Sequence, residues 1–192
     1  MLKVFRRAGL LAASLVLVAG CAGDHLVAPS SPQSPAAGPS NSLLPSLTMV
    51  TGLQRTNGLA SAITVTEVIG GAGGTLSIPA AGVMVTVPMG ALIAPVTITM
   101  TARAGTLVAY DFAPHGITFA KPLVFTQALT GTNANLLTAP LMQLGYYADA
   151  SLLTSTTAIV SELISAKVVL KTWKLTSTIP HFSGYAVSCG RE

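Results

Sequence analysis

Few side chains in this 192-residue chain are able to do covalent chemistry. The two thiols are Cys21 and Cys189. Ser183 is the hydroxyl of most interest, because His181 lies two residues before it and Phe182 lies between them. A serine close to an imidazole base has the groups that nucleophilic catalysis requires. Cys21 instead follows a short apolar segment near the N-terminus.

The first 20 residues predict an export signal. Three basic residues lie within the first seven positions, and residues 8–18 form an apolar stretch of about the length typical of a signal peptide. That stretch is too short to span a bilayer, which requires about 20 apolar residues. We therefore expect residues 1–20 to be a cleaved lipoprotein signal peptide, with Cys21 as the first residue of the exported chain.

The residues around this cleavage point predict a lipid anchor. Val18-Ala19-Gly20-Cys21 resembles the lipobox of bacterial lipoproteins, in which a diacylglycerol is joined to the cysteine before cleavage. The resemblance implies a lipidated Cys21 with two or more acyl chains, enough for stable attachment to a membrane. Ala22 follows the cysteine where an aspartate would imply retention, so the resemblance implies the outer membrane of the cell envelope. The alternative is a plain secretory signal that leaves Cys21 as a free thiol.

Residues 21–51 are rich in Pro, Ser and Ala and predict a disordered tether. No periodic apolar face exists there, and the prolines favour an extended chain over a helix. Such a tether would hold a folded domain clear of the lipid headgroups.

The charge and composition of the chain limit the classes of partner that it could bind. Charged residues make up 8% of the chain, against about 25% in typical globular proteins, which favours an exported β protein over a cytosolic enzyme. The formal net charge of +4 owes three of its basic residues to the signal peptide, so the exported part is nearly neutral. A nucleic-acid partner therefore has little electrostatic support.

From residue 52 onward, short β-branched runs separated by Gly and Pro predict an all-β fold. The predicted strands cover residues 63–69, 75–78, 83–87, 96–101, 107–112, 117–119, 123–127, 141–147, 166–175 and 184–187. Their spacing of about 8–12 residues is typical of a sandwich or barrel. Only residues 156–165 favour a helical turn or two. We expect residues 52–192 to form one β-sandwich of short antiparallel strands.

Residues 73–92 contain Val87-Pro88-Met89-Gly90, and residues 112–123 contain Phe112-Ala113-Pro114-His115-Gly116. These two stretches resemble the ZU-five domain of ankyrins, netrin receptors and zonula occludens proteins, and the match between residues 129 and 178 is weak. The resemblance implies a β-sandwich of a type usually used for contacts. We expect a chain reversal at Gly116 that brings the rings of Phe112 and Phe119 into the core. The positions that carry the resemblance are Pro88, Gly90, Pro114, Gly116, Phe119 and Pro122.

His181-Phe182-Ser183 is similar to the site at which some relatives of that family cut their own backbone between Phe and Ser. The resemblance implies that the Ser183 hydroxyl attacks the Phe182 carbonyl in an N-to-O acyl shift. His181 would move the proton, and water would then hydrolyse the ester. The tail, residues 183–192, would remain bound as a paired strand. The structural alternative makes Phe182 and Tyr185 core residues, His181 a hydrogen-bonded edge residue and Ser183 a bystander.

The sequence gives less support to metal binding, cofactor binding or phosphate binding. The three histidines, His25, His115 and His181, have no ligand spacing, so we expect no metal site, and no cofactor motif is present. Residues 70–74 are glycine-rich but lack the Lys-Ser/Thr pair of a phosphate loop, which favours a flexible hairpin connection. Cys189 is expected to be a small, partly buried hydrophobic residue, with intermolecular disulfide pairing as the alternative.

The interpretation that follows is a non-enzymatic, membrane-anchored envelope lipoprotein. Its β-sandwich would act as a protein-interaction or structural module, with the membrane and an envelope protein or glycan as partners. Tyr146, Tyr147 and Trp173 are candidate contact residues. One alternative is a self-processing domain that cleaves once between Phe182 and Ser183. Another is an envelope glycan-binding module that uses Tyr146 or Tyr147.

Overall fold

The computed structural model describes residues 46–191, which form 14 β-strands and three short 3-10 helices. The predicted signal peptide, Cys21 and most of the predicted tether lie outside the described residues. Every pairing between the strands is antiparallel. The predicted all-β fold class is confirmed.

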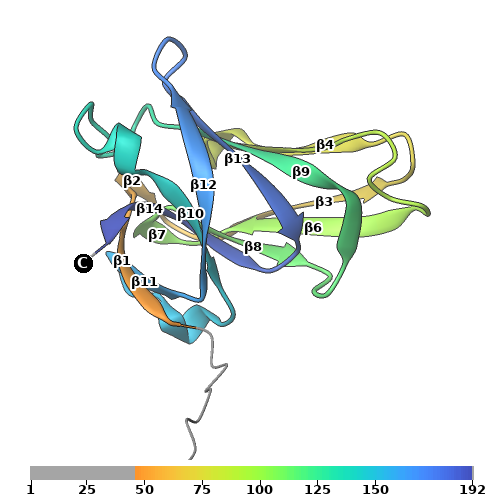
Figure 1. Cartoon of the computed structure of the whole chain (residues 1–192), viewed down its shortest axis with the longest axis horizontal. Coiled ribbons are helices and arrows are strands. Elements are labelled where there is room, and N and C mark those ends of the chain that lie inside the picture. Colours follow the sequence, from red (N-terminus) through yellow and green to blue (C-terminus); the bar gives the residue numbers. More distant parts are fainter. Residues whose placement is uncertain (1–45, 192) are drawn as a thin grey trace, which may run out of the picture. The chain divides into compact units, whose positions relative to one another are not determined.

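The strands form two packed layers, which lie one above the other in Figure 1. In hydrogen-bonded order, the first contains β3 (Ile63–Ile69), β6 (Val96–Ala102), β8 (Ala109–Ala113), β14 (Gly184–Arg191) and β10 (Gln143–Tyr147). The second contains β13 (Lys174–His181), β9 (Thr118–Ala128), β5 (Val83–Val87) and β4 (Gly74–Ile78). A separate short sheet contains β2 (Gln54–Leu59) and β7 (Gly105–Leu107).

One long strand, β12 (Glu162–Val169), joins the two layers. Residues 162–165 pair with β10, whereas residues 166–169 pair with β13. A strand that changes partners in this way forms a corner between two sheets. On the opposite side, β3 passes directly to β4 through residues 70–73, so the two layers are also joined there. The arrangement is a sandwich that is nearly closed into a barrel.

The core lies between the layers, because buried apolar side chains alternate with exposed ones along the strands. In β5, Val83, Val85 and Val87 are at most 2% exposed, while Met84 between them is 39% exposed. Ile98 of β6 enters the same core from the facing layer. Burial of each such side chain stabilises the fold by roughly 1.5–3 kcal/mol, and a one-residue slip would expose the whole set.

A second, smaller cluster lies on the other face of the first layer. It is covered by β1 (Thr48–Gly52), which pairs with both β11 (Thr157–Val160) and β14. Its members are Val50, Leu107, Ala109, Tyr147, Ala158, Val160 and Ala186. Because Val50 belongs to this cluster, the folded domain begins before the predicted boundary at residue 52.

The predicted elements need several corrections. Residues 117–119 and 123–127, expected as two strands, lie mostly in the single strand β9, and residues 107–112, expected as one strand, are divided between β7 and β8. The helical turn expected at residues 156–165 is wrong, since this segment forms β11 and the first part of β12, where Ala158 and Val160 are buried. The single strand expected at residues 166–175 is also wrong, because the chain turns back at residues 170–173 between β12 and β13. Three 3-10 helices, η1 (Pro79–Ala81), η2 (Ala139–Leu141) and η3 (Ala150–Leu152), lie in connections.

Candidate functional site

The predicted cleavage residues lie at a link between the two layers. β13 ends at His181 and β14 begins at Gly184, so only Phe182 and Ser183 carry the chain from one layer to the other. β13 is hydrogen-bonded to β9 and β12, and β14 to β8 and β10. The short link is therefore held from both sides.

Phe182 fixes this link on the side of the core. Its side chain is 2% exposed, its ring stacks on Phe112 with centroids 5.4 Å apart, and it meets Phe119 edge-on at 4.7 Å. Such aromatic pairs stabilise by about 0.5–1.5 kcal/mol beyond their burial. Phe182 is therefore a core residue that both layers hold.

Ser183 is directed toward β10. It is 5% exposed, and its hydroxyl donates to the carbonyl oxygen of Tyr147 at 3.5 Å. Its own carbonyl oxygen accepts from the amide of Phe112 at 3.1 Å. The hydroxyl makes no described hydrogen bond to His181, and neither Phe182 nor Ser183 has a left-handed backbone. The arrangement gives Ser183 a structural contact between neighbouring strands.

His181 lies in a cluster of polar and aromatic side chains. Its Nε2 is 3.6 Å from the Glu162 carboxylate, its Nδ1 is 3.2 Å from the Tyr185 hydroxyl, and its ring meets Tyr146 edge-on at 5.1 Å. The Tyr185 hydroxyl donates to the carbonyl oxygen of His181 at 2.8 Å. Burial raises the pKa of Tyr185, so this donor stays protonated at neutral pH. These contacts hold the imidazole among β12, β10 and β14.

The six positions of the ZU-five resemblance lie in turns and in β9. Gly90 and Gly116 have φ angles of 76° and 79°, a region that glycine adopts without strain. The amide of Gly90 donates to the carbonyl of Gly71 at 2.8 Å, which joins the segment after β5 to the β3–β4 connection. Phe119 packs on Phe182. Of the three prolines, Pro88 is half-buried, and Pro114 and Pro122 are exposed.

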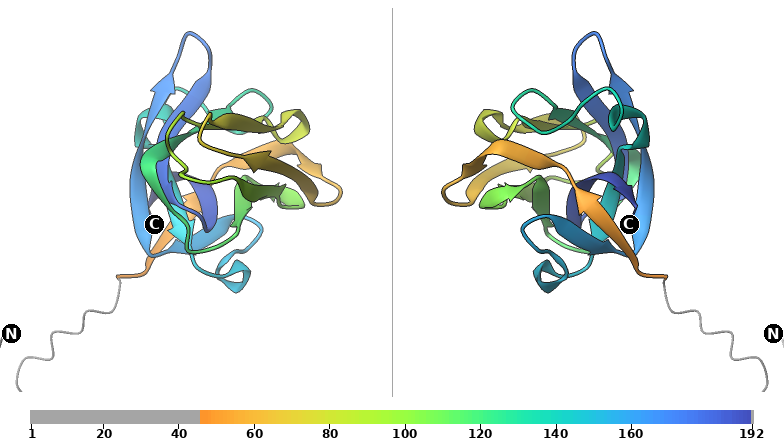
Figure 2. Two further views of the ribbon diagram at one scale, coloured as in Figure 1. Left: turned by 90° about the vertical axis from the view of Figure 1, so that its right-hand side faces the viewer. Right: turned by 90° about the vertical axis from the view of Figure 1, so that its left-hand side faces the viewer.

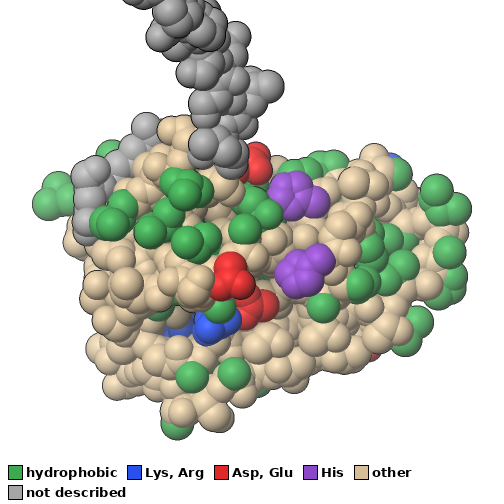
Figure 3. All heavy atoms as spheres, turned by 90° about the horizontal axis from the view of Figure 1, so that it is seen from below, with side chains coloured by type: hydrophobic (Ala, Val, Ile, Leu, Met, Phe, Trp, Pro, Cys, Tyr) green, Lys and Arg blue, Asp and Glu red, His purple; other side chains and the backbone are tan. Residues whose placement is uncertain are grey.

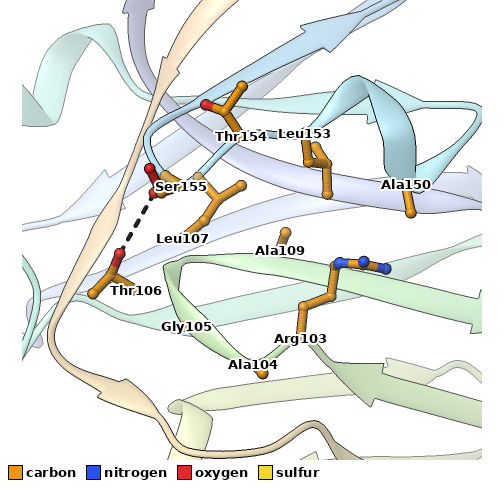
Figure 4. Close-up of a pocket in the computed structure, with 10 residues that line it drawn as sticks. All are labelled: Arg103, Ala104, Gly105, Thr106, Leu107, Ala109, Ala150, Leu153, Thr154 and Ser155. Carbon is orange, nitrogen blue, oxygen red and sulfur yellow. Dashed lines mark hydrogen bonds between the residues drawn. The ribbon is translucent and has the colours of Figure 1, made fainter.

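A groove of about 450 Å³ lies between the segment around β7 and residues 150–155 (Figure 4). Leu107, Ala109 and Leu153 contribute apolar surface to it. The Thr106 hydroxyl donates to the Ser155 carbonyl at 3.4 Å across the groove. Apolar groups beside a few hydroxyls are suited to noncovalent contacts.

Arg103 brings the only charge to the lining of this groove, and that charge is already paired. Its guanidinium is 2.7 Å from one carboxylate oxygen of Asp111, and the other oxygen accepts from the Tyr147 hydroxyl at 2.7 Å. Since no acid, histidine or cysteine lines the groove, its lining holds no side chain suited to act as a general base.

The three predicted contact aromatics differ in their exposure. Tyr147 is 1% exposed, so the prediction that it is a surface contact residue is wrong. Its ring lies in the second cluster and its hydroxyl is held by Asp111. Tyr146 is half-buried against His181, and Trp173 is half-buried at the turn between β12 and β13. Cys189 is half-buried against the core, as the sequence predicts.

Sequence reasoning missed a group of exposed leucines. Leu136, Leu137 and Leu141 precede or end η2, and Leu170 lies at the turn after β12; all four are 58–86% exposed. Their exposure has no signal in the sequence, because apolar runs of this kind equally suit buried strands. Their placement depends on how the two segments meet.

The part of the chain that the structure describes shows neither a metal-binding cluster nor a helix that could cross a membrane. Within residues 46–191, no group of three or more His, Cys, Asp and Glu side chains is arranged to hold a metal ion. None of the helices in that part of the chain combines the length and hydrophobicity needed to cross a bilayer.

Comparison with known proteins adds no relative to this description. A scan against models of protein families and a search of curated proteins both find no match. The site is therefore defined by its own geometry, and the motif resemblances remain expectations.

Proposed function

We propose that this chain is a bacterial envelope lipoprotein, held at the outer membrane by lipid on Cys21, whose β-sandwich is a protein-interaction or structural module. One observation carries the proposal: a cysteine directly follows three small or apolar residues at the end of a short apolar stretch with a basic start. The Pro- and Ser-rich residues that follow would link the lipid to the sandwich.

The contacts within the sandwich support a structural or binding role. The side chains that could do chemistry are used to hold strands together: the Ser183 hydroxyl contacts the Tyr147 carbonyl, and His181 lies between Glu162 and Tyr185. Polar contacts of this kind make a rigid framework, which is what a contact surface needs.

Metabolic labelling tests the anchor. Bacteria that produce the chain are grown with an alkyne analogue of palmitate, and the protein is recovered from membrane and soluble fractions. The wild-type chain should be labelled and sediment with membranes, whereas Cys21→Ser should be unlabelled and soluble. Cys189→Ser is the matched control, because it removes the other thiol of the chain. A wild-type chain without label would refute the proposal.

A second candidate function is self-cleavage between Phe182 and Ser183. The feature that favours it is the two-residue link, which is buried, held from both sides and adjacent to an imidazole. The Ser183 hydroxyl would have to leave the Tyr147 carbonyl before its oxygen could bond to the Phe182 carbonyl carbon. The C–N bond would then break, the amine of Ser183 would gain the proton, and water would hydrolyse the ester.

Intact mass under denaturing conditions distinguishes this candidate. Denaturation is necessary because β14 is hydrogen-bonded to β1, β8 and β10 and would hold a cleaved tail in place. Two fragments that Ser183→Ala abolishes would establish cleavage. Ser188→Ala is the matched control, since Ser188 is also buried and lies in β14. One uncut mass from the wild-type chain would exclude it.

A further inference from the structure

The hairpin formed by β12 and β13 extends beyond its neighbours. It forms the upper end of the domain in Figure 1 and in both views of Figure 2. Its turn is closed by hydrogen bonds from the amides of Thr172 and Trp173 to the carbonyls of Val169 and Leu170, at 3.2 and 3.3 Å. A projecting, hydrogen-bonded tip of this kind is able to reach a flat surface ahead of the rest of the domain.

This hairpin carries three exposed lysines without a counter-charge. Lys167, Lys171 and Lys174 take part in no ion pair with any residue that the structure describes. By contrast, Arg103 is paired with Asp111, and Arg55 is buried. Lys121 of β9 also lacks an acidic partner, but it lies outside the hairpin and donates to the carbonyl of Met89. Three of the four lysines in residues 46–191 therefore lie in this hairpin.

Apolar side chains lie among these lysines. A groove of about 350 Å³ between the hairpin and the segment before β10 is lined by residues that include Leu136, Pro140, Lys167 and Leu170. The four exposed leucines at this end are Leu136, Leu137, Leu141 and Leu170. Soluble domains rarely expose so many large apolar groups together without a partner.

Trp173, whose side chain is half-buried against the core, has an unusual backbone conformation at the tip of this hairpin. Trp173 has a φ angle of 48°, the only positive value among the non-glycine residues that the structure describes. A bulky residue is strained in this region, where glycine or asparagine would be easier to place. Backbone strain of this kind concentrates at functional sites, and Trp is favoured where lipid meets water.

We propose that this end, made by the β12–β13 hairpin and the leucines of residues 136–141, docks on an anionic lipid bilayer. The lysines would meet the phosphates of the headgroups, while the exposed leucines would enter the interface and bring Trp173 close to it. Figure 3 shows the face turned away from the hairpin tip, where a few acidic and histidine side chains lie beside Lys or Arg side chains and patches of hydrophobic ones. The lysines of the hairpin lie at the opposite end of the domain (Figure 1).

The chain is long enough for an anchored domain to dock in this way. β1 lies far from the hairpin tip in Figures 1 and 2. Residues 22–47 separate Cys21 from β1, and 26 residues span at most about 90 Å. The longest strand, β9, has 11 residues and measures only about 37 Å. The inference rests on the proposed lipid anchor only for the nearness of a membrane.

Trp173 is the single tryptophan of the chain and therefore reports on the hairpin directly. The mature full-length protein is placed in vesicles of phosphatidylcholine with or without phosphatidylglycerol, some of which carry brominated acyl chains. We expect quenching of Trp173 fluorescence and a blue shift only with phosphatidylglycerol. Lys167→Gln, Lys171→Gln and Lys174→Gln together should lower the ratio of docked to free domain by about a hundredfold.

Two controls keep this test sharp. Lys121→Gln removes a lysine outside the hairpin, one that donates to the carbonyl of Met89, and should leave the quenching unchanged. Leu136→Ser with Leu170→Ser removes apolar surface without changing charge and should also reduce quenching, while thermal melting checks the fold of every variant. A lack of quenching on phosphatidylglycerol overturns the proposal.

Other outcomes also decide the question. Equal quenching on neutral vesicles, or an emission change that follows protein density and so reports a second copy, overturns the proposal. The mass of the same preparation shows whether Cys21 carries lipid. An unlipidated chain whose Trp173 is still quenched by phosphatidylglycerol vesicles would support the hairpin and refute the anchor, so the two failures are distinguishable.

Discussion

The hydroxyl of Tyr185 donates a hydrogen bond to the carbonyl oxygen of His181, 2.8 Å away and four residues earlier in the chain. The bond spans the link between β13 and β14. Sandwiches of other families use the same device, the tyrosine corner, where a chain passes from one layer to the next. Tyr185 thus positions both the backbone and, through Nδ1, the ring of His181.

Replacing Tyr185 with Phe should therefore weaken the domain. We expect the free energy of unfolding to fall by about 1–2 kcal/mol, because the carbonyl of His181 loses its partner while the ring packing is kept. Urea unfolding followed by circular dichroism measures this loss. Tyr146→Phe is the control, since no described hydrogen bond involves the Tyr146 hydroxyl, and equal losses in both variants would contradict the role given to Tyr185.

Gly184→Ala should destabilise the domain more than Tyr185→Phe does. Gly184 pairs with Tyr147 in the β10–β14 register, and a Cβ at this glycine would overlap the Tyr147 ring. Because the Tyr147 ring is buried and has no space to move into, we expect the free energy of unfolding to fall by about 3 kcal/mol. Gly71→Ala is the matched control, as it has space for a Cβ. Similar melting temperatures for the two variants would show that the Tyr147 ring is free to move.

The buried tyrosines predict unfolding at alkaline pH. Burial raises the pKa of Tyr110 to about 12, and the pKa values of Tyr147 and Tyr185 are also raised by burial. Above pH ~10 the unfolded chain loses phenolic protons that the folded chain keeps, so stability is complete below that pH and falls above it. For Tyr110 alone, the free energy of unfolding falls by about 2 kcal/mol by pH ~12.

Urea titrations between pH 9 and roughly 12 measure this slope. Tyr110→Phe should make the decline with pH shallower, even though it also removes hydrogen bonds to Ala81 and Gln127. An identical pH slope in the wild type and in Tyr110→Phe would contradict the prediction, whatever the absolute stabilities are.

Cys189 should react slowly as long as the domain is folded. Burial raises the pKa of its thiol to about 11, so little thiolate exists at pH 8. In a Cys21→Ser chain, which has one thiol, we expect iodoacetamide to react roughly a hundredfold more slowly in buffer than in urea. Equal rates in the two solvents, or a disulfide-linked dimer in the native protein, would show that Cys189 is exposed.

Much of the sheet could be predicted from local alternation. Residues 63–69 and 83–87 were expected as strands and match β3 and β5 in both bounds, because alternate β-branched residues fit only a half-buried strand. The turn at residues 170–173 could not be predicted, since Leu170, Lys171, Thr172 and Trp173 include no Gly, Pro, Asn or Asp. The chain reverses there so that β13 pairs with β12 on one side and with β9 on the other.

The surroundings of the candidate site were beyond sequence reasoning for a related reason. The partners of His181 and Ser183 come from β12 and β10, which lie about 20 and 35 residues earlier in the chain. The pairing of strands that are this far apart in the chain determines whether the Ser183 hydroxyl contacts a histidine or a backbone carbonyl. The sequence therefore named the residues of the link, while the sheet order decides the group that each one contacts.

The mass of the mature protein tests the central claim most directly. The chain is extracted from membranes with detergent, and its N-terminal peptide is analysed by mass spectrometry. The proposal predicts a peptide that begins at Cys21 and carries a thioether-linked diacylglycerol, with residues 1–20 absent. A peptide that begins at Cys21 with a free thiol, or one that retains residues 1–20 without lipid, would contradict it.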